Sequence, residues 1–247
     1  MNLSFDLMLT IWLSVAVASV LRAFTGFGFA LAAVPIFVWV LPPSLAVVLS
    51  ASLVFATSSL RFGAYKKALP KRKVTGLLVT LIVFSSVGVV FLSSLERSGF
   101  QLLAGVILLI ACLLLVFSRR FSFSGSTFKD LFTGSAAGLL NGLLSMPGPP
   151  LIVYVLATEK DPAQSRALLM TLLLVSAALA LVNFTWMGFV TIDSLWLFLL
   201  AWPVMLLGDR LGNHWFARYG SQQYRRVAIG VLVLIALSSV ASGIGQL

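Results

Sequence analysis

Arg22 is the residue whose chemistry most needs an explanation. It is the only charged residue between Asp6 and Arg61, in a stretch made mainly of Leu, Val, Ala, Phe and Trp. A guanidinium that its surroundings cannot solvate needs a partner, and no acidic residue lies nearby in the sequence. We therefore expect Arg22 to hold an anion that is not part of the chain; the alternative is a structural pairing with backbone carbonyls.

Two stretches rich in glycine and proline supply further candidates: T-G-F-G (25–28), just after Arg22, and S-M-P-G-P-P (145–150), just after Asn141. A helix that begins inside a membrane exposes about four backbone N–H groups and roughly half a positive charge, which favours anions. Ser50 and Thr171 can approach from the next helices. The expected anion-binding residues are Arg22, Thr25, Gly26, Phe27, Gly28, Asn141, Ser145, Met146, Gly148, Pro149, Ser50 and Thr171.

The composition indicates that these residues lie in a membrane protein. Of the 247 residues, 60% are hydrophobic and 10% are charged, whereas soluble domains carry roughly 25% charged residues. Apolar runs close to the length of a membrane span recur along the chain (29–41, 45–60, 74–92, 100–117, 167–189, 194–208 and 227–241). We expect an all-α polytopic membrane protein. The first 21 residues contain no Lys or Arg, so we expect no cleavable signal peptide.

Cysteine, histidine and net charge exclude several classes of function. One Cys (Cys112) and one His (His214) argue against an internal disulfide, a thiol relay, and a multi-histidine metal or haem site. We expect no cofactor, no metal and no catalytic residue. We attribute the net charge of +10 to basic loops that set the orientation of the protein in the membrane. We therefore expect no nucleic acid as partner.

The distribution of basic residues predicts the topology. If the segment 131–157 spans the membrane once, Lys and Arg divide almost evenly between the two sides. If it enters from the cytoplasm and returns there, fifteen of the seventeen lie inside, Arg97 lies outside, and Arg22 is within the membrane. The positive-inside rule favours the second arrangement. Loops 61–73, 118–129, 158–166 and 209–226 are then cytoplasmic, and the N-terminus is outside.

Prolines and glycines within 141–150 prevent one continuous helix there. We therefore expect 131–157 to form two half-helices of about 10–14 residues each, meeting near the middle of the membrane. Residues 6–41 form the equivalent pair in the first half, although 36 residues also suffice for two nearly full crossings.

The two halves of the sequence resemble each other. L-R-A-F-T-G-F-G-F-A (21–30) aligns with L-N-G-L-L-S-M-P-G-P (140–149), so Arg22 corresponds to Asn141, and G-V-I-L-L-I-A (105–111) aligns with G-V-L-V-L-I-A (230–236). We expect two inverted repeats, each with a broken helix pair and three transmembrane helices, as in many secondary transporters. Residues 1–117 form the first repeat, 118–129 a cytoplasmic linker and 130–247 the second repeat.

The seven acidic residues all lie at expected loops or helix ends, and Asp209 comes nearest to the interior. With no carboxylate placed to carry a proton or sodium ion, we expect facilitated movement of an anion. The coupling ion and the direction of transport stay open.

The motifs G-F-G-F-A-L-A-A-V-P (26–35) and G-L-L-N-G-L-L-S-M-P-G-P-P (138–150) resemble the paired motifs of the sulfite exporter TauE/SafE family. A-V-V-L-S (46–50), R-A-L-L-M-T (166–171) and G-D-R-L-G (208–212) also fit that family. The resemblance implies a bacterial inner-membrane transporter, often an exporter, of sulfite, sulfonates and related organic anions. Its partners would be the anion and the lipid bilayer, and a homodimer is a further expectation.

Other functions stay open beside this one. The site could serve a carboxylate or another small organic anion, or the broken helices could only pack, in a membrane scaffold that transports nothing. An integral-membrane enzyme would need nucleophiles, acids or metal ligands clustered within the bilayer, and this sequence places none there.

Overall fold

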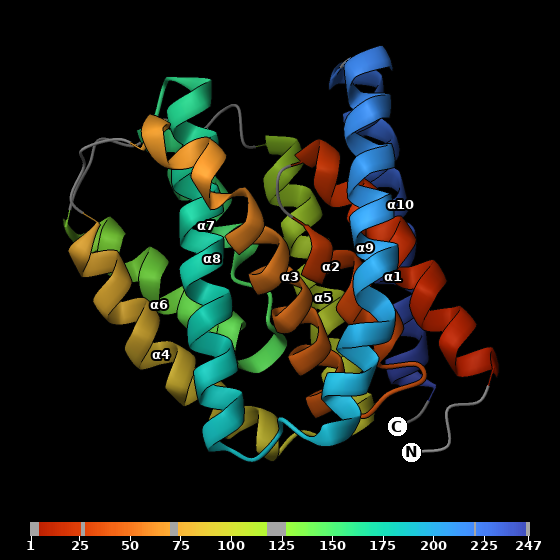
Figure 1. The fold of residues 1–247 in the computed structure, drawn as a ribbon. Coiled ribbons are helices and arrows are strands. Elements are labelled where there is room, and N and C mark those ends of the chain that lie inside the picture. The colour runs from red at the N-terminus through yellow and green to blue at the C-terminus, as the bar shows by residue number, and fades with distance from the viewer. Residues whose placement is uncertain (1–4, 26–27, 70–73, 118–126, 220, 246–247) are drawn as a thin grey trace.

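The computed structural model describes residues 5–25, 28–69, 74–117, 127–219 and 221–245. These residues fold into helices without any strand, as expected for an all-α protein (Figure 1). The α-helices are α1 (Phe5–Thr25), α2 (Phe29–Phe37), α3 (Pro43–Tyr65), α4 (Thr75–Ser93), α5 (Arg97–Phe117), α6 (Thr127–Leu144), α7 (Gly148–Thr158), α8 (Pro162–Trp186), α9 (Ile192–Tyr219) and α10 (Ser221–Ile244), and a short 3-10 helix, Lys66–Ala68, follows α3.

Six helices of the described chain are long and apolar enough to cross a membrane. They are α1, α3, α4, α5, α8 and α9, with spans of 18 to 26 residues. Many of their large side chains, such as Leu60, Phe91 and Leu199, point away from the protein interior and are exposed. A polytopic membrane protein presents such a surface to lipid, so the predicted class is confirmed.

Both expected helix breaks are present. α6 ends at Leu144 and α7 begins at Gly148, while α1 ends at Thr25 and α2 begins at Phe29. The lengths differ from the prediction, because α7 has 11 residues but α6 has 18 and α1 has 21. Each pair therefore joins one long helix to one short helix. In the first half, α1 can cross the membrane, whereas the nine residues of α2 reach only about 14 Å.

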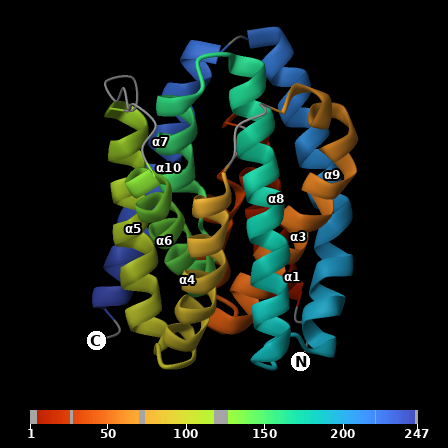
Figure 2. The same cartoon turned by 90° about the vertical axis from the view of Figure 1, so that its left-hand side faces the viewer.

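Most helix ends beside the basic loops gather at one end of the molecule, although α4 and α6 begin farther from that end (Figures 1 and 2). α3, α5, α7 and α9 all finish at the upper end in Figures 1 and 2, and α8 and α10 begin there. The turns between α4 and α5 and between α8 and α9 lie at the opposite end. This grouping is the one that the distribution of Lys and Arg predicts, although the side of the membrane that each end faces stays a prediction.

The two halves of the chain pack into each other through their first and fourth helices. α1 lies against α9, and α6 lies against α4, while α3 packs on α8 and α5 on α10. Gly208 and Gly212 of α9 face α1, just as Gly138 and Gly142 of α6 face α4. Small residues let helices approach closely in membranes. Exchanging the halves leaves this pattern of pairs unchanged, as expected of a repeat, and the inverted orientation stays a prediction.

Candidate functional site

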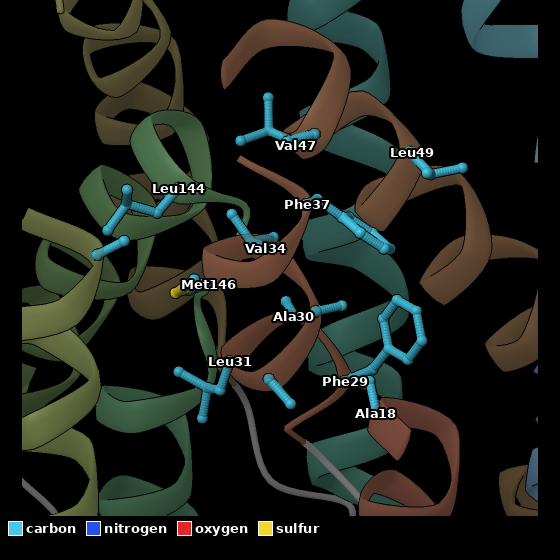
Figure 3. Close-up of a cluster of buried hydrophobic side chains, with 14 of the residues drawn as sticks. Ala18, Phe29, Ala30, Leu31, Val34, Phe37, Val47, Leu49, Leu144 and Met146 are labelled. Carbon is cyan, nitrogen blue, oxygen red and sulfur yellow. The ribbon is translucent and has the colours of Figure 1, made fainter. Parts of the chain in front are cut away.

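The short helix α2 lies in the centre of the protein. Eight of its nine residues are buried, and Figure 3 shows its side chains between α1 and α3 on one side and the break of α6 and α7 on the other. Leu144 and Met146, on either side of that break, lie beside Leu31 and Val34 of α2. Hydrophobic packing therefore holds the beginning of α2 against the second helix break.

Each break contains a residue in the left-handed conformation. Gly28, which precedes α2, has φ 96°, and Ser145, which follows α6, has φ 56°. The Ser145 N–H donates to the Asn141 carbonyl at 2.9 Å, as in helices that end in a left-handed residue, usually glycine. Pro149 and Pro150 in the first turn of α7 have no N–H to leave unsatisfied. Local backbone chemistry thus ends one helix and starts the next at both places.

Residues of both breaks line one small cavity. Its volume is about 30 Å³, which is room for roughly one or two water molecules and far below the hundreds of Å³ of an open ligand pocket, about 300 Å³ or more. Six of the predicted site residues line it: Arg22, Gly28, Asn141, Ser145, Met146 and Gly148. The first turn of α2 (Phe29, Ala30 and Leu31), Pro147, and Val54, Leu173 and Ala177 of α3 and α8 complete the wall.

Arg22 has an acidic partner, which corrects the expectation from the sequence. Its guanidinium is buried and lies 3.5 Å from Asp209 Oδ2, and its Nη2 donates to Ser58 Oγ at 3.0 Å. Arg61 lies 3.4 Å from the same Asp209 oxygen. Asp209 is 3% exposed and sits within α9, not in a loop or at a helix end. The predicted site therefore has a fixed negative charge beside it.

Asn141 uses both hydrogens of its amide within the protein. Nδ2 donates to Ser85 Oγ of α4 at 3.0 Å and to the Ser176 carbonyl of α8 at 2.9 Å. Asn183 also donates to Ser85 Oγ, at 3.2 Å. Although Asn141 lines the cavity, its donors are occupied, so an anion could take them only by breaking these bonds.

Comparison with known proteins identifies the family. The family model described as sulfite exporter TauE/SafE matches residues 11–239, which is nearly the whole described chain. This protein belongs to the TauE/SafE family. Among curated proteins, the probable sulfite/organosulfonate exporter TauE of Cupriavidus necator (strain H16) is 28% identical over 152 residues. The match covers 60% of this chain and 58% of that relative, and no solved structure matches.

Three further predicted residues of this TauE/SafE protein, Ser50, Thr171 and Pro149, are not among the described residues that line the cavity. Ser50 is fully buried in α3, and its hydroxyl makes no hydrogen bond within the described part of the chain. Thr171 donates to the Ala167 carbonyl of its own helix at 2.9 Å, and Pro149 is buried in α7. Gly26, Phe27 and the side chain of Thr25 lie outside the described residues.

Sequence reasoning missed Asp209 and Ser58 as partners of Arg22, and Arg61 as the second partner of Asp209. The signal for Asp209 was the motif G-D-R-L-G (208–212), whose glycines are four residues apart. Such spacing places both glycines on one helix face and is typical of a close helix contact. It therefore indicates that Asp209 lies inside a packed helix of this family member and not in the following loop.

Proposed function

We propose that this protein exports an organic sulfur anion, such as a sulfonate or sulfite, across the bacterial inner membrane. The name of the Cupriavidus relative and the family support this class of substrate. One observation carries the location of the site: both helix breaks and Arg22 line the same cavity. We place the anion there, between the N-terminal ends of α2 and α7, near the middle of the membrane.

The chemistry of this place suits an oxyanion. Residues at the N-terminal ends of α2 and α7 line the cavity, among them Gly28 and Gly148, and neither end has a side-chain cap. The positive ends of two helix dipoles therefore lie at the cavity. A guanidinium binds two oxygens of a sulfonate or carboxylate at once. Hydrophobic walls such as Leu31, Met146 and Leu173 exclude water, which strengthens these interactions.

We further propose that transport proceeds by alternating access. The cavity volume of about 30 Å³ is far below that of an open ligand pocket, so movement of one half against the other would widen the site for the anion. With the basic loops in the cytoplasm, an inside-negative potential favours exit of the anion, by about 2.3 kcal/mol per charge per 100 mV.

Transport by purified protein in liposomes tests this proposal. We expect the wild-type protein to release labelled sulfite or methanesulfonate from the liposomes, and the Arg22→Gln variant to release neither. Unlabelled sulfoacetate should inhibit this efflux more strongly than a dicarboxylate does. Asp209 keeps Arg61 as a partner in this variant, so the fold should persist, which size-exclusion chromatography checks. Arg210→Gln, at an exposed position of α9, is the matched control and should transport normally.

Two results would contradict the proposal. Efflux that survives Arg22→Gln would place the anion elsewhere in the protein. Efflux of dicarboxylates but not of sulfonates would show that the substrate is a carboxylate and not a sulfur anion. If the folded wild-type protein released none of these anions, a membrane scaffold would be favoured.

A further inference from the structure

Asp209 lies directly beyond Arg22 as seen from the cavity. Arg22 lines the cavity, whereas Asp209, Ser58 and Arg61 are not among the lining residues. The Asp209 carboxylate lies 3.5 Å from the Arg22 guanidinium and 3.4 Å from that of Arg61. The side chains of Arg22 and Asp209 are 5% and 4% exposed, and that of Arg61 is 34% exposed. One buried carboxylate thus joins the cavity arginine to a second arginine that reaches solvent.

The geometry of these ion pairs is loose. Both guanidinium groups approach the same oxygen, Oδ2, at distances longer than the roughly 2.7–2.9 Å of a good charged hydrogen bond. The strongest arginine pairs use two parallel N–H donors and two acceptor oxygens. An oxyanion in the cavity could form such a pair with Arg22. This pair would be stronger than the long single contact between Arg22 and Asp209, so the oxyanion could displace Asp209.

The charges at this place also favour the exchange of Asp209 for an anion as the partner of Arg22. Two guanidinium groups face one carboxylate in the described ion pairs, which leaves one positive charge for a monoanion to neutralise. Leaving a buried carboxylate without a partner is strongly destabilising. When Arg22 turns to an anion in the cavity, Arg61 can keep Asp209 paired, so neither step leaves an isolated buried charge.

We propose that Asp209 is a resident counter-ion of Arg22, which the transported anion displaces from it while Arg61 retains Asp209. This inference rests on the proposed function, because it takes the cavity as the anion site. Asp209 then sets the affinity for substrate: it neutralises Arg22 between transport cycles and helps the anion to leave. Asp209 is accordingly a positioning residue that tunes the affinity of Arg22 for the anion without direct contact with the substrate.

Binding of methanesulfonate to the full-length protein in detergent, measured by calorimetry, tests this exchange. Methanesulfonate keeps its single negative charge at all ordinary pH values, so protonation of the ligand does not confuse the result. We expect Asp209→Asn to bind about tenfold more tightly than wild type, since a competing charged interaction is lost. Arg61→Gln should bind about tenfold more weakly, because the change removes one of the two arginines that pair with Asp209 among the described residues and so strengthens its hold on Arg22. Arg210→Gln, on the exposed side of α9, should bind as wild type does.

The two variants distinguish an exchange from a merely structural pair, because loss of structure would weaken binding in both. Unchanged or weaker binding by folded Asp209→Asn overturns the inference, even where wild type binds and Arg22→Gln does not. If Asp209→Asn does not fold, the folded Arg61→Gln variant decides: weaker binding with an unfolding temperature equal to that of wild type supports the exchange, and unchanged or tighter binding overturns it. Failure of the folded wild type to bind methanesulfonate or sulfite would instead overturn the proposed function itself.

Discussion

Arg22 and Asn141 hold corresponding helices together in the two halves of the protein. Arg22 of α1 contacts Asp209 of α9 and Ser58 of α3. Asn141 of α6 donates to Ser85 of α4 and to the carbonyl of Ser176 in α8. The first helix of each half is therefore tied to the third helix of its own half and to the fourth helix of the other. One connection is charged and the other is neutral, so the cavity between them is asymmetric.

Replacing Asn141 by Leu should destabilise the protein by about 2 kcal/mol, because the change removes two buried hydrogen bonds, to Ser85 Oγ and to the Ser176 carbonyl. Thermal unfolding in detergent measures this effect. Ser93→Ala is the control, since that exposed hydroxyl bonds only within its own helix end, to the Val90 carbonyl. An equal unfolding temperature for Asn141→Leu and Ser93→Ala would show that the Asn141 bonds do not support the fold.

Local chemistry made part of the site predictable. Arg22 stands out because apolar sequence surrounds it, and Asn141 follows from the alignment of the halves. The ion pair with Asp209 could not be predicted in the same way, because 187 residues separate the partners and only the packing of α1 on α9 brings them together. An unpartnered charge in a sequence is thus a sign of a missing contact, which can be a ligand or a distant residue.

At the scale of elements, the breaks between α1 and α2 and between α6 and α7 decide where the cavity forms. Glycine and proline act within a few residues, so the sequence alone locates both breaks correctly. The lengths of the long helices could not be predicted from the sequence in the same way. α6 has 18 residues, and its glycines Gly134, Gly138 and Gly142 pack along α4, a contact that is set by the tertiary structure.

Gly142→Ala should separate α6 from α4 and destabilise the protein by about 2 kcal/mol or more. A Cβ at Gly142 would collide with the Ser85 carbonyl and would lie 2.7 Å from the Val89 nitrogen. Because Ser85 also accepts from Asn141, the change should disturb the cavity wall as well. Thermal unfolding measures the loss of stability.

Gly230→Ala provides the matched comparison. Nothing lies within 4 Å of a Cβ at Gly230 in α10, and alanine favours a helix over glycine by about 1 kcal/mol. This variant should be as stable as wild type or more so. If Gly142→Ala proved equally harmless, close contact between α4 and α6 would not be needed for folding.

At the scale of the whole molecule, most helix ends next to the basic loops gather at one end, and the α4–α5 and α8–α9 turns lie at the other (Figures 1 and 2). Counting Lys and Arg could predict this grouping because charge placement acts on each loop separately. The way in which α1 and α6 insert between helices of the opposite half could not be predicted from charge, since it depends on the shapes of the packed surfaces.

Single cysteines at Ser44 and Gln164 should react with a membrane-impermeant reagent from opposite faces of the membrane, with Gln164 at the cytoplasmic face. Ser44 lies at the start of α3 and Gln164 at the start of α8, which are corresponding helices of the two halves. Cys112 is buried and can be replaced by Ala to remove its background. Labelling of both positions from one face would contradict the inverted repeat.

The location of the bound anion tests the account most directly. A structure determined in saturating methanesulfonate should contain the sulfonate between Gly28 and Ser145–Gly148, with its oxygens within hydrogen-bond distance of the Arg22 guanidinium. Sulfonate bound at any other place, with the cavity between the two helix breaks unchanged, would contradict the account.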